Sequence, residues 1–305
     1  MKPYILIVGS SNTDMVAKAD RLPAPGETIL GNAFIMAAGG KGANQAVAAA
    51  RLGANVVFIA KVGADIFGAQ AIQSFQQEGI DTRLIATDPV NPSGVALITV
   101  DSKGENCIVV ASGANANLLP ADLSNADEMI KNASLILMQL EIPLTTVEYM
   151  AERAVAHNVP LILNPAPARP LPPDLFRMIA IITPNQKEAE MLTGIPVVDR
   201  DSAARAAKAL SAKGVKTVII TLGEAGALLF QNDTLHYISS PTVTAVDTTA
   251  AGDVFCGALT VALSEGTPMK DAVAFACSAA AISVTRLGAQ TSAPTRAELA
   301  EIRYI

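Results

Sequence analysis

A short polar turn late in the chain, Asp247 to Phe255, combines residue types that could bind a phosphate and help to transfer it. Ala250, Ala251 and Gly252 precede an apolar helical pattern, and a helix N-terminus offers unpaired N–H groups and partial positive charge to an anion. A carboxylate at Asp253 would repel phosphate, so it is better suited to taking the proton from an attacking hydroxyl. The structural alternative is that Asp247 or Thr248 is the helix N-cap and Asp253 compensates the helix dipole, which explains this segment alone more simply.

A second candidate segment is the glycine turn from Gly39 to Gly42, which opens an Ala-rich helical pattern ending at Gly53. Glycines let the backbone approach a small ligand closely, and Lys41 and Asn44 can donate hydrogen bonds to hydroxyl groups. The segment is not a Walker A loop, because Gly42 follows the lysine where that motif has Ser or Thr. It does not complete the dinucleotide fingerprint either. A tight turn before a capped helix explains it equally well.

The elements that would position these segments follow an alternating pattern. The run Ile5–Val8 is continuously apolar with β-branched residues, which is typical of a parallel strand buried on both faces. Further strands are predicted at 56–62, 135–140, 161–163, 179–183 and 217–222, with helices near 68–78, 143–157, 185–193 and 201–213. The pattern predicts an α/β fold with a doubly wound, mostly parallel central sheet flanked by helices.

Polar residues and glycines recur where these strands end. The set comprises Asn12, Asp14, Glu141, Asn164, Asn185, Glu188, Gly223 and Gly226. Because open α/β sheets bind ligands beyond the carboxyl ends of their strands, the set predicts a ligand cleft along one sheet edge. Ordinary alternatives are turn-forming roles for Asn12 and Asp14 and a first-turn helix acid for Glu188.

Two insertions, at about 12–37 and 93–112, interrupt the alternation. In the second, the segments 94–100 and 105–110 flank the turn Asp101–Gly104, a strong hairpin pattern. A small sheet built from both insertions would have an apolar face that needs covering. We expect it to form a lid and a homodimer surface, with residues 1–305 as a single domain.

The composition excludes several classes of function. The net charge of −6 and the lack of a Lys/Arg cluster argue against a nucleic-acid partner. Cys107, Cys256 and Cys277 form no Cys-x-x-Cys pair, so we expect free thiols and a reducing cytoplasm. Only His157 and His236 are available for a zinc site or a histidine triad. No apolar run is long enough to span a membrane, and no signal peptide is evident.

Taken together, the segments 39–53 and 247–255 and the motif Asn185-Gln186-Lys187-Glu188 resemble the two signatures and the magnesium-associated motif of the ribokinase (phosphofructokinase B) carbohydrate kinase family. The match runs in order from about Val8 to Ser292. The segments 39–49, 138–141, 164–169 and 284–290 are most similar to members of the family that act on ribose. The resemblance implies ATP-dependent phosphorylation of the 5-hydroxyl of D-ribose, giving D-ribose 5-phosphate and ADP.

The resemblance also implies a role for each matching residue. Asp253 would be the general base, beside an anion hole formed by Ala250, Ala251 and Gly252. The sugar would contact Asn12, Thr13, Asp14, Gly40, Lys41, Gly42, Ala43, Asn44, Glu141 and Asp253. ATP would contact Asn185, Thr221, Leu222, Gly223, Glu224, Ala225, Gly226, Gly252, Asp253 and Cys277. Glu188 would act through water on the Mg²⁺ that accompanies ATP. An activating K⁺ would use Asp247, Thr249, Ser283, Arg286, Gly288 and Ser292, mostly through backbone oxygens.

The sequence departs from the family pattern at two places. Ala250-Ala251-Gly252 stands where most of the family has Gly-Ala-Gly, and the anion-hole role is kept. Cys277 stands where some relatives have a histidine beside the adenine, so we expect a small thiol packed against the base.

Three other functions compete with ribose phosphorylation. A kinase of the same family for 2-deoxyribose, a nucleoside or another small sugar shares every motif, so only a substrate panel separates it. A catalytically silent sugar-binding regulator conflicts with the intact Asp253 and its turn. A nicotinamide-dependent oxidoreductase is disfavoured because no Gly-x-Gly-x-x-Gly follows the first strand.

Overall fold

The apolar run near the start of the chain forms β1 (Ile5–Val8), an interior strand of the main sheet in the computed structural model, which describes residues 3–302. Ile5 and Ile7 pack into one hydrophobic core cluster, whereas Leu6 and Val8 pack into a second. The strand is therefore buried on both faces, as its uninterrupted apolar sequence predicts.

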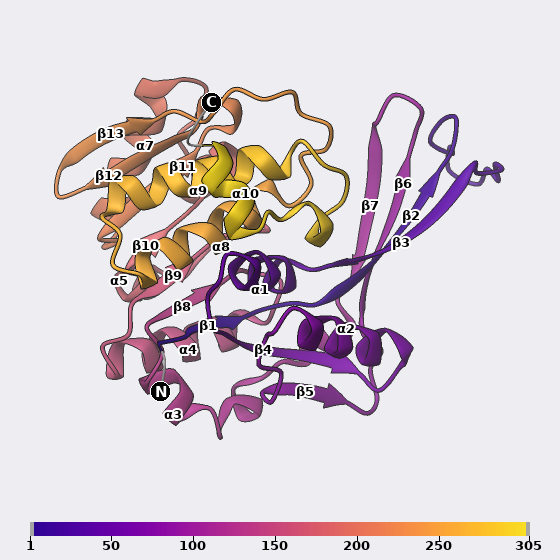
Figure 1. Cartoon of the computed structure of the whole chain (residues 1–305), viewed down its shortest axis with the longest axis horizontal. Helices are drawn as coiled ribbons and strands as arrows, with labels where there is room; N and C mark the ends of the chain where they lie inside the picture. Colours follow the sequence, from indigo (N-terminus) through magenta and orange to yellow (C-terminus); the bar gives the residue numbers. More distant parts are fainter. Residues whose placement is uncertain (1–2, 303–305) are drawn as a thin grey trace.

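The main sheet has nine strands in the order β13-β12-β11-β10-β9-β8-β1-β4-β5 (Figure 1). The others are β4 (Val56–Gly63), β5 (Ile85–Asp88), β8 (Leu135–Met138), β9 (Leu161–Leu163), β10 (Ile181–Ile182), β11 (Thr217–Thr221), β12 (Ala227–Gln231) and β13 (Thr234–Ile238). All pairings from β11 to β5 are parallel, and β12 and β13 add an antiparallel edge. The prediction of a mostly parallel central sheet is confirmed.

Helices cover both faces of this sheet. They are α1 (Lys41–Arg51), α2 (Ile66–Gln77), α3 (Asp127–Lys131), α4 (Leu144–Ala156), α5 (Pro173–Met178), α6 (Gln186–Thr193), α7 (Arg200–Ala212), α8 (Ala251–Ser264), α9 (Met269–Ser283) and α10 (Arg296–Ile302). Helices α1, α2, α8, α9 and α10 supply the core on one face, and α3 to α7 supply it on the other. Within residues 3–302, no helix is both long and apolar enough to cross a lipid bilayer.

A separate four-stranded sheet, called the lid sheet below, projects away from the main body (Figure 1). Its order is β3-β2-β6-β7, built from β2 (Asn12–Lys18), β3 (Ala33–Gly39), β6 (Gly94–Val100) and β7 (Asn106–Ala111). Strands β6 and β7 form the expected antiparallel hairpin. Asn12 and Asp14 lie in β2, so they are strand residues at the root of the lid sheet and not turn residues.

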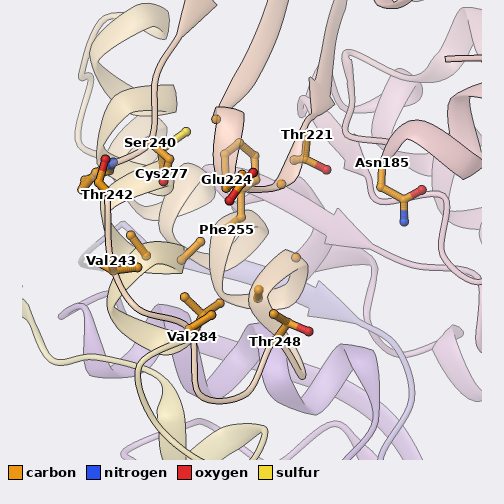
Figure 2. A pocket seen from close by; sticks show the side chains of 18 of the residues that line it. Asn185, Thr221, Glu224, Ser240, Thr242, Val243, Thr248, Phe255, Cys277 and Val284 are labelled. Carbon is orange, nitrogen blue, oxygen red and sulfur yellow. The ribbon is translucent and has the colours of Figure 1, made fainter. Parts of the chain in front are cut away.

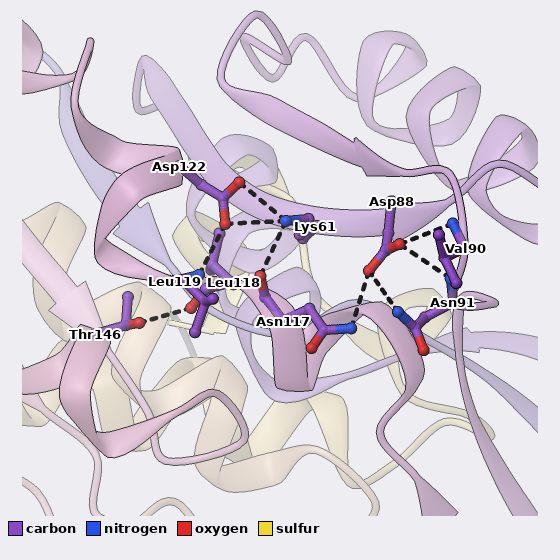
Figure 3. A network of polar contacts seen from close by, with 9 residues as sticks. All are labelled: Lys61, Asp88, Val90, Asn91, Asn117, Leu118, Leu119, Asp122 and Thr146. Atoms are coloured by element: carbon purple, nitrogen blue, oxygen red, sulfur yellow. Dashed lines mark hydrogen bonds and ion pairs between the residues drawn. The ribbon is translucent and has the colours of Figure 1, made fainter.

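A polar network fastens the root of the second insertion to the main sheet (Figure 3). Lys61 on β4 donates to the Asn117 carbonyl at 3.0 Å and to Asp122 Oδ1 at 2.9 Å. Asp88, at the end of β5, accepts from the Asn91 backbone N–H and from Asn117 Nδ2, both at 2.9 Å. The segment before β6 and the 3-10 helix after β7, Gly113–Asn117, are thereby held together.

Candidate active site

Helix α8 begins without a side-chain cap. Its N-cap is Ala250, which has a left-handed φ of 58°, and none of the described side chains accepts a hydrogen bond there. An Asp247 or Thr248 cap, the structural alternative drawn from the sequence, is therefore wrong. The position of a Cβ added to Gly252 has no neighbour within 4 Å. The first turn is consequently open and able to receive an anion.

Asp253 is buried against α1, with 5% of its surface exposed. Asn44 Nδ2 donates to its Oδ2 at 2.9 Å, and Gln45 Nε2 donates to its Oδ1 at 3.0 Å. The two helices approach closely because Gly257 faces α1: a Cβ there would lie 2.9 Å from both the Gln45 carbonyl and the Ala48 methyl. Each carboxylate oxygen of Asp253 thus has a neutral amide donor.

Charged groups from three elements and one loop surround this carboxylate. Burial raises the pKa of Asp253, while the positive charge of Lys41 and the two amide hydrogen bonds oppose that rise. Burial acts to lower the pKa of Lys41, but attraction to Asp253, Glu141 and Glu188 outweighs it, so the pKa is raised. Burial, followed by repulsion from Glu141 and Asp253, raises the pKa of Asp14 to about 6. The site therefore holds several acids and one firmly charged lysine.

Two cavities meet at the first turn of α8. The larger, about 880 Å³, extends along α8 and α9 (Figure 2). The smaller, about 170 Å³, is polar and reaches Lys41, Glu188 and Asp253. Both are lined by Asn185, Thr221, Thr248, Ala251 and Gly252. A ligand spanning both cavities would therefore pass directly over the open helix end.

Most residues predicted to contact ATP line the larger cavity. They are Asn185, Thr221, Gly223, Glu224, Gly226, Gly252 and Cys277, whereas Asp253 lines the smaller one. Leu222 and Ala225 are not among the lining residues of either cavity. Burial raises the pKa of the Cys277 thiol to about 12, so it lines the cavity as a neutral group.

The sequence did not reveal one wall of the larger cavity. It consists of Ser240, Pro241, Thr242, Val243, Ala245, Phe255, Ala280, Ala281 and Val284 (Figure 2). The loop from 240 to 245 shows no hydrophobic periodicity that would indicate a binding site, although its Ser-Pro step predicts a turn. Phe255, Ala280, Ala281 and Val284 look like ordinary apolar helix positions in sequence.

The glycine turn forms one wall of the proposed sugar site. Glu141 Oε2 accepts from Ser10 Oγ at 2.6 Å and from the Lys41 backbone N–H at 3.1 Å. Gly40 has a φ of 91°, and a Cβ there would lie 2.7 Å from the Asn12 nitrogen. Glycine is required at this position because the backbone of β2 passes so close.

Two amides of this region are oriented by neighbours. Asn12 Oδ1 accepts from Asn115 Nδ2 at 2.8 Å, which turns the Asn12 amide nitrogen away from Asn115. Asn44 donates to Asp253, and its Oδ1 is buried without a partner among the described residues. A buried acceptor left open in this way suits a ligand hydroxyl.

The remaining predicted sugar residues lie on the same two segments. Thr13 alternates with Asn12 and Asp14 along β2, so it faces the other side of the lid sheet. Ala43 is fully buried and Gly42 is buried; a Cβ on Gly42 would lie 2.6 Å from the Gly9 carbonyl carbon. Both allow α1 to start close to β1.

Asn185 and Glu188 form a reciprocal pair at the start of α6. The Asn185 N–H and Nδ2 donate to Glu188 Oε2 and Oε1, both at 2.8 Å, and Asn185 Oδ1 accepts from the Glu188 N–H at 2.9 Å. This is a capping box, so the helix-acid interpretation of Glu188 is confirmed. Glu188 also lines the smaller cavity, and burial raises the pKa of its carboxyl.

Asp247 joins the two loops predicted to bind a monovalent cation. Its Oδ1 accepts from the Thr249 N–H and its Oδ2 from the Gly288 N–H, both at 2.9 Å. The Ser283 and Ser292 hydroxyls donate to the carbonyls of Ala280 and Ala289, respectively.

The side chain of Arg286 pairs with Glu298 at 2.6 Å, so it too is engaged away from the loops. These loops therefore offer a cation mainly backbone oxygens. No group of three or more His, Cys, Asp or Glu side chains that could hold a metal occurs in the described part of the chain.

A buried acid beside an open helix end and two joined cavities are the parts that phosphoryl transfer to a small molecule needs. A family model described as pfkB family carbohydrate kinase matches residues 2–296. The chain therefore belongs to the pfkB family of carbohydrate kinases.

Individual relatives are similar over nearly the whole chain. A ribokinase from Haemophilus influenzae is 46% identical over 99% of this chain and 98% of its own length. A deoxyribokinase from Salmonella typhi is 39% identical over 95% of both chains. The structure of Arabidopsis thaliana ribokinase complexed with ribose and ATP superposes with a TM-score of 0.95 at 32% identity, covering 100% of both chains.

Proposed function

We propose that this enzyme transfers the γ-phosphoryl group of ATP to the 5-hydroxyl of D-ribose, giving D-ribose 5-phosphate and ADP. The observation that carries the proposal is the position of Asp253, buried in the small polar cavity where that cavity meets the larger one. Ribose would occupy the small cavity and ATP the large one. Similarity to ribokinases that cover nearly the whole chain supports the choice of sugar.

In this mechanism Asp253 accepts the proton of the 5-hydroxyl as the hydroxyl oxygen bonds to the γ-phosphorus. The bond from that phosphorus to the bridging oxygen breaks, and ADP leaves. The backbone amide of Gly252 and the N-terminal charge of α8 stabilise the negative charge on the transferred group, whereas the Ala251 amide already donates to the Thr248 carbonyl at 3.3 Å. The lid sheet helps to exclude water from the reaction.

The sugar would be held by groups from β2, α1 and the segment after β8. Asp14 and Glu141 accept from sugar hydroxyls, Asn12 Nδ2 donates, and the open Asn44 Oδ1 accepts. The Salmonella relative makes 2-deoxyribose the competing substrate, since it is similar over 95% of the chain. The donor of Asn12 would favour a sugar with a 2-hydroxyl.

Mg²⁺ would enter with ATP and neutralise phosphate charge. Glu188 could hold this Mg²⁺ through a water molecule, because its buried carboxylate lines the smaller cavity, which also borders the start of α8. K⁺ would bind between the 247–249 turn and the 283–292 segment, which Asp247 already ties together. Its proposed effect is indirect: it fixes the turn that presents the α8 amides.

We further propose that residues 1–305 form one domain, of which 1–2 and 303–305 lie outside the described residues, and that two copies pair through the lid sheet. That sheet exposes large apolar side chains, namely Phe34, Ile35, Met36, Leu97, Ile108, Val109 and Val110. Exposed apolar area of this kind is typical of an interface. Sedimentation that shows only monomer at micromolar concentration would exclude the dimer.

The free thiols Cys107, Cys256 and Cys277 fit a reducing cytoplasm.

The substrate panel that tests the proposal measures ADP release from ATP and Mg²⁺ with D-ribose, 2-deoxyribose, fructose 6-phosphate, adenosine and pseudouridine, each with and without K⁺. We expect K⁺-stimulated turnover with ribose above all other acceptors. Preference for another acceptor would keep Asp253 as the base and reassign the sugar contacts. No turnover with any acceptor would favour a silent binding protein.

A further inference from the structure

A chain of buried side-chain amides lies behind Asp253. Gln45 and Gln139 are both fully buried, at 0% exposed. Gln139 Nε2 donates to Gln45 Oε1, and Gln45 Nε2 donates to Asp253 Oδ1 at 3.0 Å. Gln139 follows β8 and Gln45 lies on α1, so these amides link the main sheet to the acid on α8.

A third amide fixes the direction of this chain. Asn164 Nδ2 donates to the Thr183 carbonyl at 3.1 Å, so Asn164 must present its Oδ1 to Gln45. Gln45 Nε2 lies 3.1 Å from that oxygen, and a flipped Gln45 would place two oxygens against each other. Gln45 must therefore turn its N–H groups, and not its oxygen, toward both Asn164 and Asp253.

The row of side-chain amides leaves one acceptor unpaired and thereby keeps this direction. With its nitrogen turned to Gln45, Gln139 leaves its Oε1 buried without a partner among the described residues. A buried acceptor without a partner is unfavourable. The arrangement is explained if a donor is needed at Asp253, since an ionised carboxylate can only accept.

We propose that Gln45, held in one orientation by Gln139 and Asn164, is a positioning residue that keeps Asp253 ionised and aligned for proton transfer. This inference rests on the proposed function of Asp253 as the base. Gln45 itself does not reach the reacting atoms in the proposed mechanism; it acts through the carboxylate.

The charged and titratable groups around Asp253 set the expected direction of the effect. They are Asp14 on β2, Lys41 on α1, Glu141 after β8, Glu188 on α6 and Cys256 on α8. Burial and Glu141 raise the pKa of Asp253, and Lys41, Asn44 and Gln45 oppose them. Removing the Gln45 donor leaves one fewer opposing group, so the base should hold its proton to higher pH.

The test measures kcat against pH for Gln45→Met at saturating ribose, ATP, Mg²⁺ and K⁺. Because Asp14 is engaged by bound sugar, kcat reports Asp253 better than kcat/KM does. We expect the acidic limb of the kcat–pH profile to move to higher pH by about one unit. On that limb kcat should be about tenfold lower than in the wild type, and it should recover as the pH rises. The KM for ribose should change less than about twofold.

Two further variants keep the test decisive. Gln139→Met leaves Gln45 beside Asn164 and should shift the acid limb in the same direction by a smaller amount, even if Gln45→Met fails to fold. Thr146→Val removes a buried hydrogen bond to the Leu118 carbonyl away from the site and should leave the pH profile unchanged.

An equal loss of kcat at every pH in both glutamine variants, or a change confined to KM, would overturn the positioning role. Wild-type enzyme without ribose-dependent ADP release would instead overturn the proposed function on which it rests. The two failures are therefore distinguishable.

Discussion

Asn44 Nδ2 donates to Asp253 Oδ2 at 2.9 Å, which joins the two sequence signatures across 209 positions of the chain. A residue expected from the sequence to contact the sugar therefore also holds the acid that would accept the sugar's proton. Its Oδ1 remains buried and open. Substrate binding and base alignment are thus coupled through one amide, and the predictions below follow from that arrangement.

Replacing Asp253 by asparagine should nearly abolish turnover. Asp253→Asn removes the base but keeps the size of the side chain, so kcat should fall by about 10²–10⁴-fold, the usual contribution of a positioned base. Steady-state kinetics gives kcat, and calorimetry should show ribose affinity close to that of the wild type. Near-normal turnover in this variant would remove Asp253 from its role.

Asp14 should make both sugar affinity and stability depend on pH. Its pKa is raised to about 6 by burial and neighbouring acids, above the ordinary value of 3.8, so the folded protein binds a proton that the unfolded chain releases. Folding stability should therefore fall as the pH rises from about 4 to above 6. Asp14 accepts a hydrogen bond from a sugar hydroxyl when it is ionised, so the KM for ribose should rise as the pH falls below 6 and the carboxylate is protonated.

The variant that checks this is Asp14→Asn. It should unfold at a higher denaturant concentration than the wild type at pH 7, because the partly buried negative charge at position 14 is removed from among the neighbouring acids, and it should bind ribose more weakly. Asp174→Asn is the matched control, since the Asp174 side chain is 84% exposed, and its stability should change by less than about 0.5 kcal/mol. Equal stability of Asp14→Asn and wild type at pH 7 would contradict the raised pKa.

Asn12 should determine the preference between ribose and 2-deoxyribose. Its Oδ1 is held by Asn115, so its Nδ2 is the group left to donate to a sugar hydroxyl. A buried donor left unpaired by a deoxy sugar costs about 1–3 kcal/mol, so kcat/KM should favour ribose by about tenfold or more. Asn12→Ala should reduce that ratio. A higher kcat/KM for 2-deoxyribose in the wild type would place the enzyme with its deoxyribokinase relative.

Asp247 should control activation by K⁺. Burial acts to raise the pKa of Asp247, but hydrogen bonds from Thr249 and Gly288 outweigh it, so the carboxylate is ionised and ties the two loops. Asp247→Ala should lower turnover and abolish the difference between K⁺ and tetramethylammonium. Kinetics across a series of cations checks this, and equal wild-type activity in tetramethylammonium would exclude the cation site.

The sequence predicted those parts of the site in which local pattern and ligand geometry coincide. The glycine turn at 39–42 needs small residues because other backbone passes close to it, and the turn before Asp253 places small residues at an open helix end; both leave a readable signature. The parallel sheet followed from continuous apolar strands such as Ile5–Val8.

Other features depend on contacts between distant segments. Gln45 and Gln139 come together across 94 positions, and Asn115 meets Asn12 across 103, so neither pairing leaves a local pattern. The antiparallel edge of β12 and β13 was also not predicted. Its tight turn places Asn232 and Asp233 at positive φ, and this Asn-Asp pair was the available signal.

The central claim is that Asp253 directs the γ-phosphoryl group of ATP to the 5-hydroxyl of ribose. NMR of the product formed from ¹³C-labelled D-ribose, ATP, Mg²⁺ and K⁺ tests it directly, with wild type and Asp253→Asn compared at equal enzyme concentration. We expect phosphorus coupling at C5 alone for the wild type and product formation reduced by about 10²-fold or more for the variant. Phosphate on another carbon, or equal product from both proteins, would contradict the account.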